Sequence, residues 1–114
     1  MGDHRRRLGA AGEDLAAAHY AAEGYEILAR NWRCAEGELD LVLRRDRSVV
    51  ICEVKTRASA DHGSPLEAVT AAKQRRLRRL GARWLREHRV GCREVRFDVV
   101  GVVGGRVEVV EDAF

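Results

Sequence analysis

The sequence predicts an α/β fold in which a mixed central β-sheet is flanked by α-helices. Two stretches, residues 8–23 and 64–89, carry apolar residues at helical spacing. Between them lie three strand-like segments, and a Gly104-Gly105 pair separates two more. The order of helix, three strands, helix and two strands is typical of helices packed against a mixed sheet. The 114 residues suit a single domain, which we place at residues 1–114.

The first helix is predicted over residues 8–23. Its apolar positions recur at helical spacing and are Leu8, Ala11, Leu15, Ala18 and Ala22. Gly24 follows as the residue that ends the helix. Residues 25–30 then form a strand, and we expect Asn31 to begin a loop.

The second helical stretch has a clear start. Ser64 is the expected N-cap, Pro65 takes the first helical position, and Glu67 closes a capping box. We expect this helix to break near Thr70, which would cap a second segment that continues to about residue 89.

The remaining segments complete the expected sheet. A polar loop is predicted at residues 58–63, and strands are predicted at residues 95–103 and 106–110. These last strands could pair beside the strand that carries Glu53, but the sequence leaves their order open.

The two central strands bring charged residues together. A turn centred on residues 46 and 47 would pair Asp40 with Glu53 and Glu38 with Lys55. Paired side chains share one face of the sheet and lie about 4.5–5.5 Å apart at Cβ. The opposite face is apolar, and we expect it to be a core face made of Leu39, Leu41, Leu43, Val50, Cys52 and Val54.

This cluster has the composition of a metal-dependent hydrolytic site. Two close carboxylates repel each other unless a cation lies between them, and carboxylate oxygens suit Mg²⁺ or Mn²⁺. Lys55 points to the same side as Glu53 and could position or deprotonate a water molecule, or stabilise a charged phosphate oxygen. Together these groups describe metal-assisted hydrolysis of a phosphodiester. The alternative is a surface hairpin with solvated ion pairs, but charges on one face of otherwise apolar strands favour a functional site.

Short motifs are distributed in order along nearly the whole chain. They are Leu8-Gly9-Ala10-Ala11-Gly12-Glu13, Gly24-Tyr25-Glu26-Ile27-Leu28, Arg30-Asn31, Gly37-Glu38-Leu39-Asp40, Glu53-Val54-Lys55-Thr56-Arg57, Lys73, Arg96-Phe97-Asp98-Val99-Val100 and Asp112-Ala113-Phe114. Each motif alone is weak, but the ordered set resembles the YraN family of bacterial proteins. The acid, hairpin and Glu-x-Lys also resemble the core of the PD-(D/E)XK, or restriction-endonuclease-like, superfamily.

The resemblance implies a restriction-endonuclease-like core and a set of site residues. Asp40, Glu53 and the backbone carbonyl of Val54 would be metal ligands, Lys55 the catalytic lysine, and Glu13 the helical acid found in many members of the superfamily. The chain departs from the superfamily's name in one respect, because Leu39 stands before the acid where a proline is expected.

The acid of the first helix has a plain alternative role. Glu13 could be a solvated helical residue, but Gly9 and Gly12 beside it suggest a close approach of backbone or substrate. Glycine costs about 1 kcal/mol relative to alanine within a helix, so its presence calls for a reason.

Three further residues are candidates for contact with nucleic acid. Lys73 lies on the apolar stripe of its helix, where it could reach the acidic cluster or a phosphate, or extend past the core to water. Gln74 borders that stripe and could assist, and Arg57 lies just beyond Lys55. The opposite side of this helix is either a solvated face or a set of phosphate contacts, and it carries Arg75, Arg79, Arg83 and Arg86.

Composition narrows the class of protein. The net charge of +3 comes almost entirely from arginine, whose planar fork of donors fits phosphate. Three cysteines without metal-ligand spacing fit a reducing cytoplasm, with Cys52 as a small core residue. We expect no signal peptide, because Arg5, Arg6 and Arg7 are followed by an Ala-rich amphipathic stretch and not by a continuous apolar segment. We expect no membrane span, because no apolar run approaches about 18 residues.

Two functions remain open from the sequence. The first is a Mg²⁺- or Mn²⁺-dependent nuclease that recognises nucleic-acid structure rather than a long base sequence, with DNA favoured over RNA. A symmetric homodimer would widen its footprint. The second is a non-catalytic nucleic-acid-binding or scaffold protein that retains the fold. An enzyme acting on small molecules is disfavoured, because the chain has no Gly-rich phosphate loop or cofactor motif.

Overall fold

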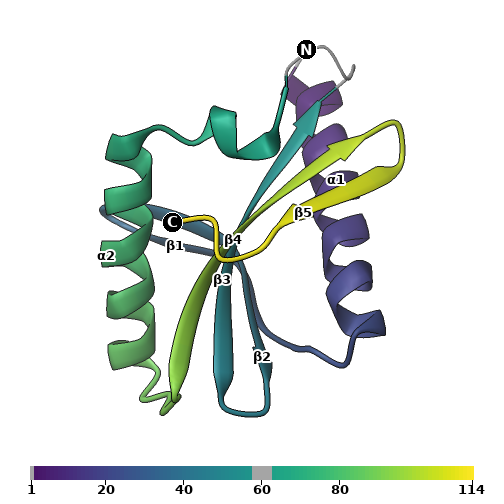
Figure 1. Cartoon of the computed structure of the whole chain (residues 1–114). Coiled ribbons are helices and arrows are strands. Elements are labelled where there is room, and N and C mark those ends of the chain that lie inside the picture. Colours follow the sequence, from purple (N-terminus) through teal and green to yellow (C-terminus); the bar gives the residue numbers. More distant parts are fainter. Residues whose placement is uncertain (1, 58–62) are drawn as a thin grey trace.

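The computed structural model describes residues 2–57 and 63–114, with side chains from residue 9 onward. In this part of the chain, two helices flank a five-stranded sheet (Figure 1). In chain order the elements are α1 (Gly2–Ala22), β1 (Glu26–Cys34), β2 (Gly37–Arg45), β3 (Ser48–Arg57), the 3₁₀ helix η1 (Pro65–Ala68), α2 (Ala71–Glu87), β4 (Glu94–Val103) and β5 (Arg106–Val110). The predicted α/β class, with a mixed sheet between helices, is confirmed. Most of the predicted polar loop at 58–63 lies outside the described residues.

The strands follow one another across the sheet in the order β1-β2-β3-β4-β5. Neighbouring strands are antiparallel except β3 and β4, which are parallel and pair from Ser48↔Glu94 to Arg57↔Val103. Parallel neighbours need a crossover connection, and η1 and α2 supply it. Of the last two strands, whose order the sequence left open, β4 therefore lies beside the strand of Glu53, and β5 pairs with β4 at the edge of the sheet.

One face of the sheet is covered by α1. Ala16, Ala17 and Tyr20 pack against the strands, and the buried strand residues there include Leu41, Leu43, Val50, Cys52 and Val100. We call this cluster the α1-side core. A Cβ atom on Gly12 would collide with the side chain of Thr56 on β3, so glycine lets α1 approach the sheet closely. Gly9, by contrast, faces open space.

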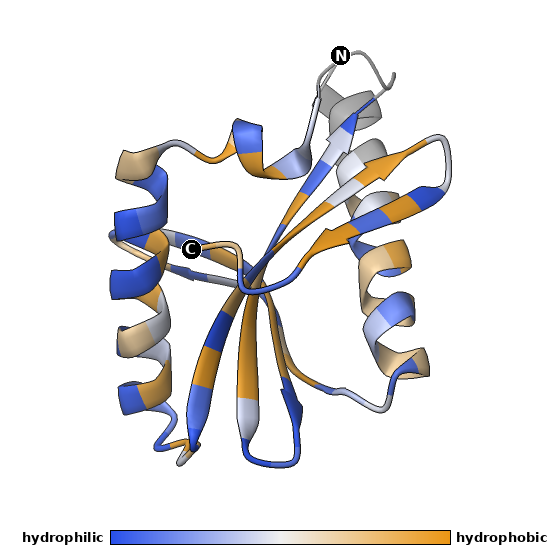
Figure 2. Cartoon of the chain, in the orientation of Figure 1, coloured by the Kyte–Doolittle hydropathy of each residue, from blue (hydrophilic) through white to orange (hydrophobic). Residues whose placement is uncertain are grey.

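The other face of the sheet is covered by α2. Leu77, Leu80 and Trp84 pack against strand residues such as Val42, Val49, Ile51, Phe97 and Val99, and we call this cluster the α2-side core. Figure 2 shows hydrophilic residues on the outer side of α2 and apolar residues toward the sheet.

The predicted break before α2 is confirmed. Ser64 caps η1 by accepting a hydrogen bond from the Leu66 N–H at 3.4 Å, and Thr70 caps α2 by accepting one from the Lys73 N–H at 3.1 Å. The helix ends at Glu87, slightly before the predicted position.

The β1–β2 hairpin differs from the prediction. Asn31 does not begin a loop: β1 continues to Cys34, with a register shift between Ile27 and Ala29 and a positive φ of 52° at Asn31. These irregularities bend the strand, and its far end curls toward α2, as Figure 1 shows.

The bend also moves one residue from the predicted core face. Leu39 belongs to the α2-side core and not to the α1-side core that holds Leu41 and Leu43. A Cβ on the nearby Gly37 would lie 3.2 Å from the Leu80 side chain, which shows how closely the hairpin end approaches α2.

A buried polar network connects α1 to β4 and to the chain just after β5. Asp98 is fully buried and accepts hydrogen bonds from the Tyr20 hydroxyl at 2.7 Å, from Arg96 at 2.9 and 3.0 Å, and from the Asp112 N–H at 3.0 Å. Because the charge of Asp98 is both paired and hydrogen-bonded, its burial is tolerated. Cys52 is buried nearby in the α1-side core, as expected.

Among the described helices, none combines the length and apolar character that crossing a membrane requires.

Candidate functional site

The acidic residues lie where β2 and β3 separate. From Leu41↔Cys52 to the turn, the strands pair in the predicted register. The ladder ends at that pair, so the predicted pairs of Asp40 with Glu53 and of Glu38 with Lys55 are not ladder pairs.

Beyond this pair, the side chain of Asp40 takes the place of a backbone acceptor from β2. Its Oδ2 accepts a hydrogen bond from the Val54 N–H at 2.8 Å. The N–H and C=O of one strand residue point to the same side, so the Val54 carbonyl also faces the opening between the strands. A carboxylate and a backbone carbonyl are thereby presented to one small space.

The two carboxylates are buried and act on each other. Asp40 is 9% exposed and Glu53 is 5% exposed. Burial, followed by the hydrogen-bonding and charge effects of Glu53, raises the pKa of Asp40 to about 8, and the hydrogen bond from the Val54 N–H opposes that rise only in part. Without a metal ion at this site, Asp40 therefore retains its proton near neutral pH.

Two lysines complete the charged part of the site. Lys73 of α2 forms an ion pair with Glu53, through Nζ and Oε2. Desolvation alone would lower the pKa of Lys73, but hydrogen bonding to Glu53 and attraction from it raise that pKa above its usual value. Desolvation, followed by repulsion from Lys73, lowers the pKa of Lys55.

These groups line one pocket between the sheet and α2. The pocket has a volume of about 350 Å³. Its charged lining includes Asp40, Glu53, Lys55, Lys73 and Arg76, and Leu77 and Leu80 supply an apolar wall. The predicted cluster of Asp40, Glu53 and Lys55 thus does converge, although through an opened ladder and not through direct strand pairing.

Glu13 lies at the edge of this arrangement. Its charge contributes to the raised pKa of Asp40, which places it within electrostatic reach. Its own ion-pair partner is Arg30 of β1, with Nη2 and Oε1 3.8 Å apart. Glu38, on the rim of the pocket, pairs with Arg33 at 3.1 Å and not with Lys55 as predicted.

The other predicted contact residues have separate places. Gln74 donates a hydrogen bond to the Val69 carbonyl at 3.2 Å, across the junction of η1 and α2. Arg57 lines a second hollow of about 320 Å³ beside η1, together with Pro65 and Val103. The structure therefore brings Lys73 to the acidic pocket but not Gln74 or Arg57.

Arg76 is a lining residue that sequence reasoning missed. It follows Lys73 by three positions, and residues three apart on a helix lie on neighbouring parts of one side. That spacing could have assigned Arg76 to the pocket. The hydrogen bond from Val54 to Asp40 has no comparable signal in the sequence, because it depends on where the ladder ends.

The donor set fits a hard divalent cation that keeps several waters. Among residues 2–57 and 63–114, no three His, Cys, Asp or Glu side chains form a metal-binding group. The site offers two carboxylates and one backbone carbonyl, and Mg²⁺ is commonly held by one or two carboxylates with water and substrate oxygens. The ammonium of Lys73 already lies against Glu53, so the site accepts a cation at that oxygen.

Comparisons with known proteins give the family. A model of the uncharacterised protein family UPF0102 matches residues 12–102. A UPF0102 protein of Parafrankia sp. is 55% identical over 97 residues, covering 85% of this chain and 82% of its own length. A UPF0102 protein of Nocardioides sp. is 52% identical over 102 residues, covering 90% and 82%, and one of Rhodococcus opacus is 47% identical over 116 residues, covering 97% and 98%. The chain therefore belongs to the uncharacterised protein family UPF0102.

Proposed function

We propose that this protein is a metal-dependent nuclease that hydrolyses phosphodiester bonds of nucleic acid. We also propose that its sheet and helices form a restriction-endonuclease-like core of the PD-(D/E)XK type. The observation that carries the proposal is the convergence of Asp40, Glu53, Lys55 and the Val54 backbone at the point where β2 and β3 separate. A structural hairpin has no need to bury two carboxylates beside two lysines, since burying charge is costly.

Each residue has a distinct role in this proposal. Asp40, Glu53 and the Val54 carbonyl would hold Mg²⁺ or Mn²⁺. When bound, the cation would act as a Lewis acid and lower the pKa of a water molecule bound to it. The partly buried Lys55 is placed to orient the attacking water or to take its proton, because desolvation favours its neutral amine. Glu13 acts from the edge of the site through its charge.

The lysine and arginine at the pocket wall suit a phosphate group. Lys73 and Arg76 approach the acidic pair from α2, opposite the strands that carry the carboxylates. A phosphate there would lie between cations on one side and the metal site on the other. Arg57 would contact the substrate further along β3, whereas Gln74 holds the start of α2 in place through Val69.

The compact chain favours recognition of nucleic-acid structure over a base sequence. The elements described are fully used in building one sheet and its two covering helices. Recognition of branches, flaps or single strands would need only the pocket and the charges around it.

Cleavage of a labelled substrate panel tests the proposal. Single strands, duplexes, flaps and four-way junctions of DNA and RNA would be incubated with Mg²⁺, Mn²⁺ or chelator. We expect metal-dependent cleavage that Asp40→Asn, which alters a metal ligand, and Lys55→Ala, which removes the acid–base group, each reduce by at least about 100-fold. Glu38→Gln is the matched control. It also removes a carboxylate from β2, but that carboxylate forms its ion pair with Arg33 and not within the acidic cluster.

The result that contradicts the proposal is equally specific. If no substrate is cut in either metal, and the wild type and Asp40→Asn bind nucleic acid equally, the protein is a binding or scaffold protein with this fold. Thermal melts of all variants would establish that loss of cleavage is not loss of folding.

A further inference from the structure

The exposed face of α2 has an unusually restricted composition. Its exposed residues are five arginines (Arg75, Arg76, Arg78, Arg79 and Arg86), three alanines and a single acid, Glu87. Arginine presents a planar fork of donors that matches phosphate oxygens, and alanine leaves the helix surface free of bulk. A flat polyanion could therefore come close to the helix.

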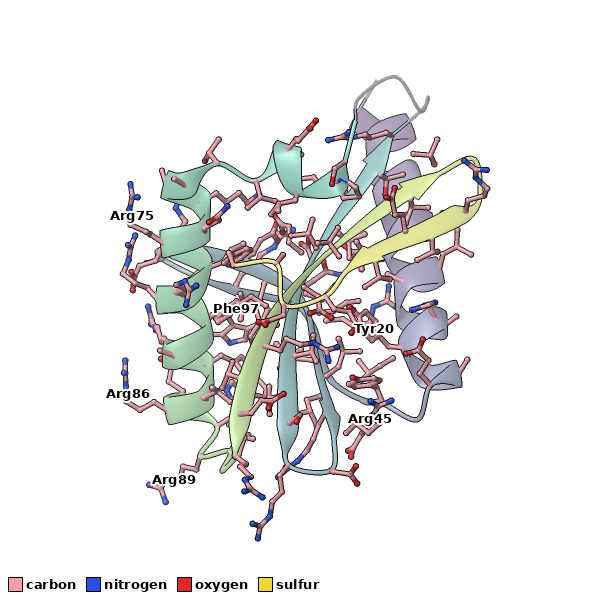
Figure 3. All side chains as sticks on the ribbon, in the orientation of Figure 1. Tyr20, Arg45, Arg75, Arg86, Arg89 and Phe97 are labelled. Atoms are coloured by element: carbon pink, nitrogen blue, oxygen red, sulfur yellow. The ribbon has the colours of Figure 1, made fainter. Side chains whose placement is uncertain are left out.

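Three of these arginines lie along one line. Arg75, Arg79 and Arg86 are spaced four and seven residues apart, which places them on the side of α2 opposite the buried Leu77 and Trp84. Figure 3 shows Arg75 and Arg86 projecting away from the sheet. The row spans about 16 Å, at about 1.5 Å per helical residue. We call Arg75, Arg79 and Arg86 the α2 arginine row.

The charge of this row is only partly compensated. Glu87 pairs with Arg83 at 2.8 Å, and Glu36 lies 3.4 Å from Arg83 and 4.0 Å from Arg79. Within the described part of the chain, Arg75 and Arg86 form no ion pair. Two cations are thus held outward on a rigid element without an internal partner.

We propose that the α2 arginine row binds the phosphate backbone of double-stranded DNA. The inference rests on the proposed nuclease function and names its substrate class. Single-strand binders stack bases on aromatic side chains, but the aromatic residue of α2, Trp84, is buried in the core. Recognition of RNA commonly uses the 2′-hydroxyl, and the exposed face of α2 carries no hydroxyl or amide side chain to contact it.

The row also leads to the acidic pocket. Arg76 belongs to the exposed face of α2 and lines the pocket as well. A duplex lying along the helix would cover the row with about five base pairs, at about 3.4 Å each. One strand of the DNA would then reach Arg76 and Lys73 in the pocket. The surface of α2 would therefore hold a double-stranded segment of the substrate next to the bond that is cut.

The test is a binding titration in chelator, where cleavage does not occur. Fluorescence anisotropy would follow a labelled 16-base-pair DNA between 50 and 300 mM salt. The test variant is Arg75→Gln/Arg86→Gln. The matched control is Arg45→Gln/Arg47→Gln, which removes the same charge. Both side chains are exposed and lie at the β2–β3 turn, at the opposite end of these strands from the acidic pocket, and Figure 3 shows Arg45 near the end of α1.

The expected effect follows from counterion release. Each lost phosphate contact lowers the salt slope of the binding constant by about 0.9, which is about eightfold in affinity at 0.1 M salt. The test variant should therefore lose about 60-fold in affinity and about 1.8 in slope, while the control stays within about threefold of the wild type. Duplex RNA, single-stranded DNA and anionic phospholipid vesicles should bind the wild type more weakly than duplex DNA.

Three results would overturn the inference. They are absent duplex binding by the wild type, equal losses in the test and control variants, and tighter binding of duplex RNA, single strands or vesicles. The proposed nuclease function is tested independently of this inference. Row-dependent duplex binding without cleavage of any substrate would leave this surface in place and remove the nuclease, whereas cleavage with an unchanged kcat/KM in the test variant would do the reverse.

Discussion

Lys73 should compete with the divalent cation for Glu53, and Lys73→Gln tests that idea. In the metal-free protein the Lys73 ammonium is the cation against the buried Glu53 carboxylate. The side chain of Lys73 is 34% exposed and that of Glu53 is 5% exposed, so the pair is intermediate between a surface and a buried ion pair. Surface pairs contribute about 0.2–1 kcal/mol, and breaking a buried pair costs about 3–5 kcal/mol. We therefore expect Lys73→Gln to lower the free energy of unfolding by about 2 kcal/mol in chelator.

The same substitution should matter much less when metal is bound. A cation held by Asp40 and Glu53 would neutralise the carboxylate that Lys73 otherwise pairs with. Since the metal no longer has to displace the ammonium, the variant should bind Mg²⁺ up to about 30-fold more tightly, which is 2 kcal/mol at about 1.4 kcal/mol per tenfold. The cost of the substitution should fall below about 0.5 kcal/mol at saturating Mg²⁺.

Thermal melts and calorimetric titration with Mg²⁺ at pH 8 would measure both effects. In chelator the melting temperature should fall by about 8 °C, at about 4 °C per kcal/mol for a chain of this size. Lys73→Arg keeps the charge and should behave like the wild type. Arg76→Gln removes a charge from the same pocket without touching the Glu53 ion pair, and should show no such metal dependence.

Equal destabilisation by Lys73→Gln in chelator and in Mg²⁺ would refute the reasoning. So would an unchanged or weaker affinity for the metal. Either result would mean that Lys73 and the cation do not share a position at Glu53.

Three further outcomes are expected. Because its folded pKa is raised to about 8, Asp40 contributes stability that is fully present below its unfolded pKa of about 4 and is lost as pH rises through about 8. Chelator melts of the wild type should therefore show a decline over this window that Asp40→Asn lacks, and Mg²⁺ affinity should rise toward pH 8 as the proton is released. Gly12→Ala should lower the free energy of unfolding by about 1–2 kcal/mol, because its Cβ would collide with Thr56. Gly9→Ala, on an open part of the same helix, should leave that free energy unchanged or raise it by up to about 1 kcal/mol. Urea unfolding of both variants distinguishes a packing role of the glycine from ordinary helix propensity. Asp98→Ala should lower the free energy of unfolding by about 3–5 kcal/mol, since it leaves buried donors without their acceptor, and a loss below about 1 kcal/mol in the same assay would contradict that role.

Much of this molecule can be read from local sequence. The polar turn between two apolar strands sets the register, because a slip of one residue would turn every side chain to the other face, and the pairs from Leu41↔Cys52 onward follow it. The cap at Thr70 and the apolar stripe of α2 likewise depend on spacing alone, and they place Lys73 toward the sheet. The same periodicity predicted that Asp40, Glu53 and Lys55 would lie close together, and all three line one pocket, although not through the predicted strand pairs.

Tertiary structure decides how the site is built. The β2–β3 ladder ends at Leu41↔Cys52, and beyond that pair the Asp40 carboxylate accepts the Val54 N–H, in the part of the β1–β2 hairpin that bends toward α2. The same bend carries Leu39 to the α2-side core. No local pattern encodes it, because it arises from packing between segments distant in the chain.

The crossover through α2 was equally beyond the sequence. Parallel pairing of β3 with β4 requires a long connection but leaves no turn signal, since the hydrogen-bonded partners are more than forty residues apart. It is this crossover that lays α2 across the carboxylates, giving Glu53 its lysine and separating Arg57 into a second hollow. Periodicity thus determined which residues face inward, and the long-range pairing of strands determined which of them meet.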